Sequence, residues 1–166
     1  MSTSFADLGV PDDVAAALER RGATSPFPIQ EATLPDLLAG RDVCGRAPTG
    51  SGKTLAFGVP LAVRVGKGTA RRPRALVLSP TRELAEQIHR EITPLLATRG
   101  RKAVSVYGGV GYGGQRSALR KGVDVLVACP GRLEDLVQGG DVDLGDIEIV
   151  VIDEADRMAD MGFLPA

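Results

Sequence analysis

The sequence predicts an α/β fold in which a parallel β-sheet carries helices on both faces. From residue 42 onward, short apolar runs rich in Val and Ile alternate with segments of helical periodicity. The runs are largely apolar, as in strands that are buried on both faces. Strands that alternate with helices indicate parallel pairing. The length of 166 residues, with 43% hydrophobic and 25% charged residues, suits one compact domain with an ordinary core.

The expected elements follow one another in a regular order. Helical stretches near Asp12–Arg21 and Ile29–Leu38 come first, and Gly22 and Gly40 follow them as C-terminal stops. The five apolar runs predicted as strands are Asp42–Arg46, Ala75–Ser79, Ala103–Tyr107, Val123–Ala128 and Ile147–Ile152. Two further helices are expected where apolar residues recur at helical spacing, at Leu84, Ile88, Ile92 and Leu95 and at Leu133, Leu136 and Val137.

Several classes of protein are excluded by composition. The longest stretch without Asp, Glu, Lys or Arg has 13 residues, Ala103–Gln115, whereas a membrane helix needs about 20 apolar residues. The first basic residue is Arg20, so the basic start of a signal peptide is missing. The two cysteines, Cys44 and Cys129, are too few for a disulfide framework or a four-ligand zinc site. We therefore expect a cytoplasmic protein without membrane contact, in which Cys44 packs inside the first strand.

Charge is distributed unevenly along the chain although the net charge is only −1. Residues 61–132 carry 14 basic and 4 acidic side chains, and residues 133–166 carry 1 basic and 10 acidic side chains. A basic middle beside an acidic end is compatible with a phosphate-binding face next to a magnesium site. It is equally compatible with basic side chains that only solvate loops.

A glycine-rich turn directly after the first predicted strand carries the strongest local signal. It reads Ala-Pro-Thr-Gly-Ser-Gly-Lys-Thr over residues 47–54. In such a turn successive backbone N–H groups wrap a polyphosphate at the start of the next helix. Lys53 then reaches the β- and γ-phosphates, and the Thr54 hydroxyl binds Mg²⁺. The predicted cofactors are ATP and Mg²⁺, and the predicted nucleotide contacts are Ala47, Thr49, Gly50, Ser51, Gly52, Lys53 and Thr54.

The last predicted strand ends in Asp153-Glu154-Ala155-Asp156. A carboxylate pair at the end of an apolar strand is the magnesium-side partner of a phosphate-binding loop. Asp153 would hold the metal through its water shell, and Glu154 would orient or deprotonate the attacking water. The predicted catalytic residues are therefore Lys53, Asp153 and Glu154, and the predicted metal ligands are Thr54 and Asp153.

Taken in order, these motifs resemble those of the first RecA-like domain of DEAD-box RNA helicases, a P-loop NTPase fold, over nearly the whole chain. Residues 22–30, Gly-Ala-Thr-Ser-Pro-Phe-Pro-Ile-Gln, resemble the family's Q motif. The resemblance implies that Gln30 presents its amide to the adenine edge and that Phe5 packs near the base. It divides the chain into a Q-motif region, residues 1–40, and a RecA-like domain, residues 41–166.

Three more segments resemble motifs through which the family contacts RNA. Residues 80–85 resemble motif Ia, Gly108-Gly109 the paired glycines, and residues 129–132 motif Ib, with Cys129 in place of the usual Thr. All three follow predicted strands and should lie on one edge of the sheet. Backbone N–H groups and guanidinium groups bind phosphate without reading sequence. The residues that the resemblance assigns to the RNA phosphates are Thr81, Arg82, Gly109, Gly131 and Arg132.

The resemblance implies the ATP-binding half of an ATP-dependent RNA helicase, which would unwind RNA or remodel RNA–protein complexes with a second RecA-like domain. The two alternatives are a related motor that acts on DNA and a non-catalytic RNA-binding scaffold. The family's Ser-Ala-Thr motif III, expected after Ala166, is absent from the sequence. We therefore expect the protein to continue past Ala166, residues 1–166 to be nearly inactive alone, and the strands at 42–46 and 147–152 to have unpaired inner edges.

Overall fold

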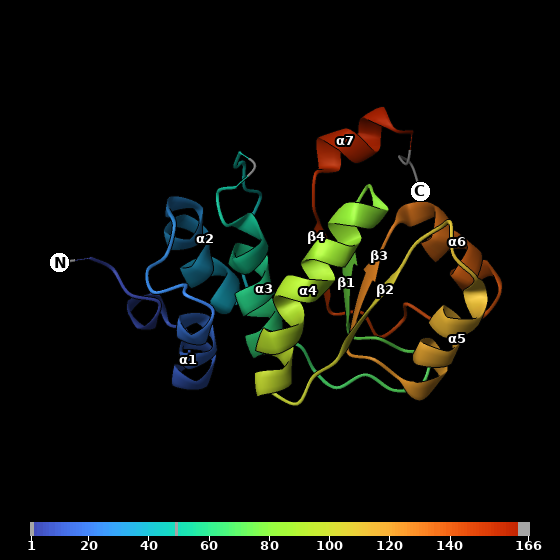
Figure 1. Cartoon of the computed structure of the whole chain (residues 1–166), viewed down its shortest axis with the longest axis horizontal. Coiled ribbons are helices and arrows are strands. Elements are labelled where there is room, and N and C mark those ends of the chain that lie inside the picture. Colours follow the sequence, from blue (N-terminus) through green and yellow to red (C-terminus); the bar gives the residue numbers. More distant parts are fainter. Residues whose placement is uncertain (1, 49, 163–166) are drawn as a thin grey trace. The chain divides into compact units, whose positions relative to one another are not determined.

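The computed structural model describes residues 2–48 and 50–162 and divides the chain into two compact units (Figure 1). The first, which we call the helical unit, comprises Met1–Arg64 and Glu91–Gly100. The second, which we call the sheet unit, comprises Val65–Arg90 and Arg101–Ala166. The nucleotide motifs near residues 30 and 50 belong to the helical unit, and the other motifs belong to the sheet unit.

The sheet unit contains a four-stranded parallel sheet in the order β2-β3-β1-β4 (Figure 1). In the central pair, Ala75 lies opposite Val125 and Leu78 lies opposite Ala128. The predicted α/β fold and four of the five predicted strands are thus confirmed. The strands are β1 Ala75–Leu78, β2 Ala103–Val106, β3 Val125–Ala128 and β4 Ile149–Ile152.

The predicted strand at Asp42–Arg46 is wrong. Residues 41–48 have no regular secondary structure, and residues 41–46 are exposed to solvent. A strand needs a neighbour to pair its N–H and C=O groups, and no strand pairs with this segment in the described part of the chain. Its backbone is therefore left to water, and Cys44 is exposed rather than part of a core.

The expected unpaired edge of β4 is confirmed, because β4 pairs with β1 alone among the described residues. Exposure alternates along β4, and the apolar side chains of Val150 and Ile152 are each 55% exposed. An exposed apolar edge of this kind favours association with another strand.

Four helices agree with the sequence prediction, and the glycine stops are confirmed. Gly22 and Gly40 follow the first two helices with φ angles of 82° and 83°, which favour glycine. The helix α5 was not predicted, because its N-cap is Gly111 and two of its first three residues are Gly113 and Gly114, which disfavour helix. The helices are α1 Asp12–Arg20, α2 Pro28–Leu38, α3 Lys53–Arg64, α4 Arg82–Thr98, α5 Tyr112–Lys121, α6 Pro130–Gln138 and α7 Ala155–Asp160, with a 3₁₀ turn at Ala6–Leu8.

Helices α5 and α6 pack on the sheet, and of the apolar residues whose spacing predicted α6, Leu133 and Leu136 are buried whereas Val137 is exposed. Leu119 of α5 and Leu136 of α6 are almost fully buried against strand residues. This packing fixes the loops that connect each strand to the next helix. The core cluster comprises Leu76, Val106, Leu119, Val123, Leu126, Ala128, Leu133, Leu136 and Val142.

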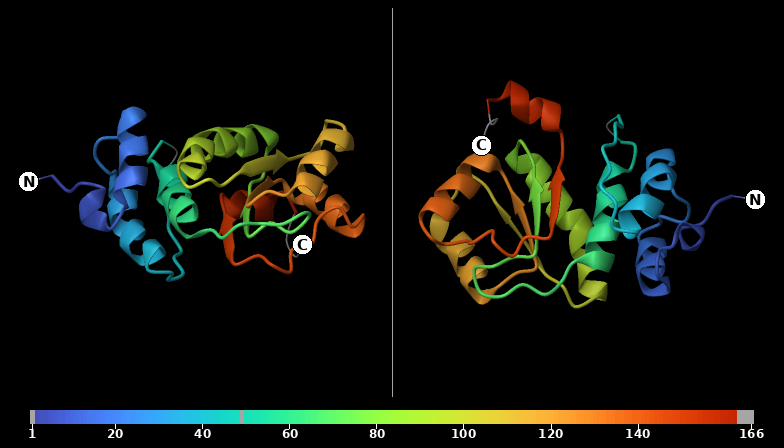
Figure 2. Two further views of the ribbon diagram at one scale, coloured as in Figure 1. Left: turned by 90° about the horizontal axis from the view of Figure 1, so that it is seen from below. Right: turned by 180° about the vertical axis from the view of Figure 1, so that it is seen from behind.

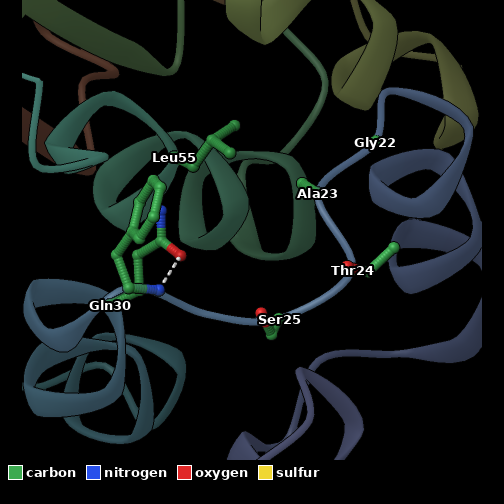
Figure 3. A pocket seen from close by; sticks show the side chains of 7 residues that line it. Gly22, Ala23, Thr24, Ser25, Gln30 and Leu55 are labelled. Carbon is green, nitrogen blue, oxygen red and sulfur yellow. Dashed lines mark hydrogen bonds between the residues drawn. The ribbon is translucent and has the colours of Figure 1, made fainter.

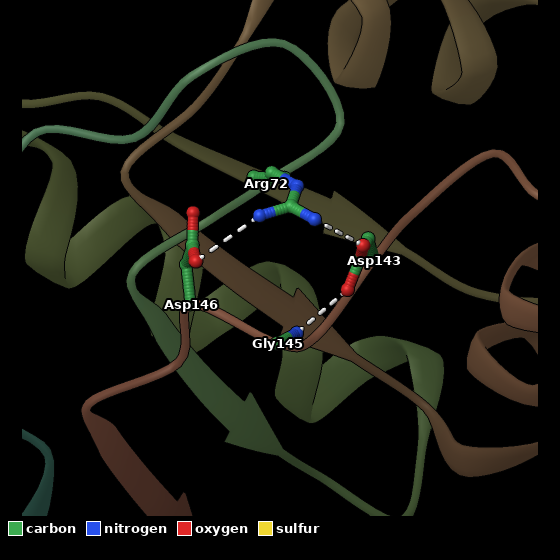
Figure 4. Close-up of polar contacts among 4 residues, drawn as sticks. All are labelled: Arg72, Asp143, Gly145 and Asp146. Atoms are coloured by element: carbon green, nitrogen blue, oxygen red, sulfur yellow. Dashed lines mark hydrogen bonds and ion pairs between the residues drawn. The ribbon is translucent and has the colours of Figure 1, made fainter.

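Aspartate carboxylates connect the loops at the amino ends of the strands through hydrogen bonds and ion pairs. Arg72 is paired with Asp143 at 2.8 Å and Asp146 at 3.3 Å, and the Gly145 N–H donates to Asp143 (Figure 4). That N–H bond, together with the Arg72 guanidinium, lowers the pKa of Asp143. Asp124 is buried and accepts from the N–H groups of two loops, at residues 68 and 102. The loops at the amino edge of the sheet are thus bonded to one another, so the carboxyl edge is the one available to ligands.

In the helical unit, α2 lies beside α3 (Figure 2). Their apolar faces bury Leu34 and Val59, and Ile92 of α4 packs close to Gly58. Phe5 is only 4% exposed and belongs to the same core. This packing places the first turn of α3 next to the first turn of α2.

The reactivity of the two cysteines tests the finding that residues 42–46 do not form a buried strand. Burial, with a smaller effect of Glu83, raises the pKa of Cys129 to about 11, so its thiol stays protonated and unreactive at pH 8. Cys44 is exposed. Iodoacetamide at pH 8 should therefore alkylate Cys44 of the 166-residue chain at least several times faster than Cys129, as measured by peptide mass spectrometry. Equal protection of both thiols would support a buried strand at residues 42–46 instead.

Candidate functional site

The glycine-rich turn leads directly into α3, which begins at Lys53. Gly50 and Gly52 have φ angles of 79° and 80°, a region that side chains other than glycine rarely adopt. Lys53 and Thr54 occupy the first turn of α3, whose free N–H groups and positive dipole end favour an anion. The turn therefore has the backbone form of a phosphate site; Thr49 lies outside the described residues.

The first turn of α2 contacts this phosphate loop through Gln30. Its Oε1 accepts from the Phe27 N–H at 2.9 Å, and its Nε2 donates to the Gly52 carbonyl at 2.9 Å. A Cβ atom on Gly52 would lie only 2.4 Å from Phe27 Cδ2 and 2.5 Å from Gln30 Nε2. Residue 52 must therefore be glycine for two reasons, its backbone angle and its close neighbours.

A pocket opens beside Gln30 (Figure 3). Its walls come from the segment after α1, from the first turn of α2 and from Leu55 of α3. Phe5 is not among the lining residues, so its predicted packing on a base remains a prediction. The residues that line the pocket are Gly22, Ala23, Thr24, Ser25, Phe27, Gln30 and Leu55.

Ser51 supplies the observation that tests whether this loop fits a phosphate. Its hydroxyl oxygen is buried and has no hydrogen-bond partner in the described part of the chain. A buried hydroxyl without a partner costs about 1–3 kcal/mol. A phosphate oxygen in the loop would supply an acceptor, so the residues present fit a nucleotide phosphate.

In the sheet unit, Asp153 directly follows β4. Its N–H donates to the Leu78 carbonyl at 3.0 Å, which fixes it at the carboxyl end of β1, and its side chain is buried. Glu154 caps α7 with φ 53° and ψ 52°, a left-handed conformation that is unfavourable for a residue other than glycine. Strain of this kind is typical of functional sites. Arg157 lies 3.3 Å from the Glu154 carboxylate.

The predicted RNA contacts lie along the same edge of the sheet, in the loops that follow β1, β2 and β3. The Thr81 hydroxyl accepts from the Leu84 N–H at 3.3 Å and caps α4, and Arg82 is exposed at the first position of that helix. Gly109 has φ 84°, and a Cβ atom on Gly131 would meet no neighbouring atom within 4 Å. The expectation that these three loops share one edge is confirmed.

Comparison with known proteins agrees with this arrangement. The family model for the DEAD/DEAH box helicases matches residues 27–166. The chain belongs to the DEAD/DEAH box helicase family. It is 50% identical to the maize DEAD-box ATP-dependent RNA helicase 3A, chloroplastic, over 170 residues, which cover 96% of this chain and 22% of that protein. It is 44% identical to ATP-dependent RNA helicase RhlB of Shigella dysenteriae, covering 96% of this chain and 39% of RhlB.

Solved structures of DEAD-box proteins share the fold. The ADP-bound RNA helicase Prp28 of Chaetomium thermophilum superimposes with a TM-score of 0.87 and 40% identity, covering 96% of this chain and 40% of that chain. A DEAD box protein of Methanococcus jannaschii gives a TM-score of 0.89 at 33% identity, covering 97% and 44%. This DEAD/DEAH box domain therefore has the predicted RecA-like fold, and it spans between 22% and 44% of the length of these relatives.

Arg132 is nearly buried in this DEAD/DEAH box domain and has internal partners. Its side chain is only 8% exposed, its Nη1 donates to Gln115 Oε1 at 3.1 Å, and its Nη2 donates to the Val110 carbonyl at 3.0 Å. Its guanidinium also stacks on the Tyr112 ring, 3.9 Å from the centroid. Two of the five N–H donors of Arg132 thus hold the segment after the paired glycines, and the predicted phosphate contact of Arg132 stays a prediction.

Sequence reasoning missed the residues that organise this edge. Tyr107 and Tyr112 each donate the hydroxyl to a carboxylate, of Glu86 and Asp135 respectively. Each ring also lies under an arginine. The pattern of one tyrosine on either side of Gly108-Gly109 was visible, but the carboxylate partners come from other helices and could not be assigned.

Helices long and apolar enough to cross a membrane are absent from residues 2–48 and 50–162 of this DEAD/DEAH box domain. The names of its relatives include chloroplastic and mitochondrial proteins. Family membership therefore does not fix the compartment, and a cytoplasmic location remains a prediction.

Proposed function

We propose that this chain is the ATP-binding part of an ATP-dependent RNA helicase that contacts the RNA phosphate backbone. The observation that carries the proposal is the glycine turn before α3, where the Ser51 hydroxyl has no hydrogen-bond partner among the described residues and the Gln30 amide bonds the Gly52 carbonyl. ATP hydrolysis and duplex unwinding would require a second RecA-like domain. The relatives named as ATP-dependent RNA helicases support this assignment.

Each of the predicted nucleotide, metal and catalytic residues would have its own role in phosphoryl transfer. The N–H groups of the turn and Lys53 would bind the β- and γ-phosphates. Thr54 and Asp153 offer the hard oxygen ligands that Mg²⁺ prefers, and the ion would neutralise negative charge on the phosphates. Glu154 would accept the proton of the attacking water.

The RNA side of the proposal rests on the carboxyl edge of the sheet. Thr81, Arg82, Gly109 and Gly131 would contact phosphates, because Gly109, Gly131 and the Arg82 side chain are exposed at this edge. Such contacts fix position without reading the bases, so binding should be independent of sequence and sensitive to salt.

Selectivity for ATP over GTP tests the proposed nucleotide site. The Gln30 amide can donate and accept at the adenine edge, whereas guanine presents two acceptors, O6 and N7, at the same place. ATP should therefore bind more tightly than GTP, and Gln30→Ala or Gln30→Glu should weaken ATP binding about tenfold or more, as measured by calorimetric titration of the full-length protein. Glu31→Gln, a change at the exposed neighbouring position, serves as the matched control and should leave ATP affinity unchanged.

Equal affinity of the unmutated protein for ATP and GTP would contradict the role of Gln30. Failure to bind either nucleotide would favour the RNA-binding scaffold, and stimulation of turnover by DNA but not RNA would favour the DNA motor.

A further inference from the structure

Tyr107 lies at the carboxyl end of β2, directly before the paired glycines. Its hydroxyl, its carbonyl and its ring each contact another residue. Its hydroxyl donates to Glu86 Oε1 at 2.6 Å, its carbonyl accepts from Gln115 Nε2 at 3.1 Å, and its ring lies under Arg82 with the guanidinium carbon 4.9 Å from the centroid. A distance of 2.6 Å is typical of a hydroxyl that donates to an ionised carboxylate.

The pKa directions agree with this protonation state. The Tyr107 hydrogen bond lowers the pKa of Glu86, and the same bond raises the pKa of Tyr107. At neutral pH the carboxylate is therefore charged and the phenol keeps its proton. The bond persists under the conditions in which RNA would bind.

Tyr107 and Glu86 both contact the Arg82 side chain, which remains exposed to solvent. Its Nε lies 3.6 Å from the same Glu86 oxygen, and its side chain is 47% exposed. A Cβ atom on Gly109 would lie 3.9 Å from Arg82 Nη1, so the guanidinium sits beside the glycine. A free arginine side chain loses conformational entropy when it binds a phosphate, and a side chain that is already held loses less.

We propose that Tyr107 is a positioning residue for RNA binding, which holds the Arg82 guanidinium beside Gly109 in the orientation that meets a phosphate. The inference rests on the proposed function, because it assumes that Arg82 binds RNA. The Arg82 guanidinium covers one face of the Tyr107 ring, and the Tyr107 hydroxyl donates its hydrogen bond to Glu86. Tyr107 therefore acts through Arg82 rather than by stacking on a base at that face.

The network extends from Tyr107 to the buried arginine. Gln115 bonds the Tyr107 carbonyl through Nε2 and accepts from Arg132 through Oε1. Arg132 in turn holds the Val110 carbonyl. The backbone on both sides of the paired glycines is thus fixed, and so is the position of the tyrosine ring.

A double-mutant cycle in the full-length protein tests the proposal, with a fluorescent decauridine RNA and binding measured by anisotropy. Tyr107→Leu should weaken RNA binding about twofold to fivefold, the range expected for an exposed cation–π contact. Tyr107→Phe keeps the ring and should lose less. In the Arg82→Ala background, Tyr107→Leu should cause no further loss. Arg82→Ala should also reduce the slope of log K against log salt by about 0.7, as for one lost contact to single-stranded nucleic acid.

Tyr112→Phe is the matched control, because Tyr112 makes the same kind of bond, to Asp135 at 2.9 Å, on the other side of the glycines. It should leave RNA affinity within twofold. An equal loss from Tyr107→Leu with and without Arg82 would overturn the proposal and assign Tyr107 a direct RNA contact. A loss from Arg82→Ala with none from Tyr107→Leu would overturn the positioning role and leave the proposed function intact. Unchanged binding in Arg82→Ala would overturn both the positioning role and the Arg82 contact.

Discussion

Replacing Glu154 with Gln should lower ATP turnover by about 10²–10⁴-fold while ATP binding survives, because removal of a general base typically costs that much. The amide keeps the size of the side chain, leaves Asp153 in place and meets the same left-handed backbone angle. Turnover is measured as phosphate release under saturating ATP and RNA in the full-length protein, and binding is measured by titration.

Asp160→Asn is the matched control, since it removes an exposed carboxylate from the last turn of the same helix, α7. It should leave turnover within about twofold. Unchanged turnover in Glu154→Gln would show that another group takes the proton of the attacking water. Loss of ATP binding in that variant would show instead that Glu154 is needed for the nucleotide site itself.

Arg132→Met should destabilise the protein by about 2–4 kcal/mol. The change leaves the buried Gln115 Oε1 without its donor, at about 1–3 kcal/mol, and removes the bond to the part-buried Val110 carbonyl. It also removes the stack on Tyr112. The free energy of unfolding is obtained from urea denaturation followed by circular dichroism.

Arg116→Met provides the comparison, because Arg116 also lies over the Tyr112 ring, at 4.9 Å, but is 44% exposed and paired with Asp141. Surface pairs of this kind contribute about 0–1 kcal/mol. If Arg132→Met were no more destabilising than Arg116→Met and reduced the salt dependence of RNA binding, Arg132 would be a phosphate ligand after all.

The fold was predictable where local pattern and packing agree. The runs at β1 and β3 are apolar on both faces, and the apolar spacing of α4 and α6 matches their buried sides. The segment at Asp42–Arg46 has a comparable pattern, but β-structure depends on a neighbouring strand, which a local pattern cannot supply. Helix α5 was missed for the opposite reason, since tertiary packing of Leu119 overrides its glycine-rich start.

The site was predictable where chemistry is carried by a contiguous motif. The glycine turn, Gln30 and Asp153 were assigned from short segments, and the structure places Gln30 against the turn and Asp153 at the end of β4, while their roles toward a nucleotide stay predictions. The internal partners of Arg132 could not be predicted, because Gln115 and Tyr112 reach it from another helix. The pairing of Tyr107 with Glu86 joins residues 21 positions apart, so it could be seen only in three dimensions.

The central claim, that this chain contributes an ATP site coupled to RNA, is tested most directly by the RNA dependence of ATP hydrolysis in the full-length protein. The account predicts that single-stranded RNA of any sequence stimulates phosphate release from ATP, that DNA of the same length does so far less, and that Glu154→Gln abolishes the stimulation. ATP hydrolysis at the same rate with and without RNA, or stimulation by DNA alone, would contradict it.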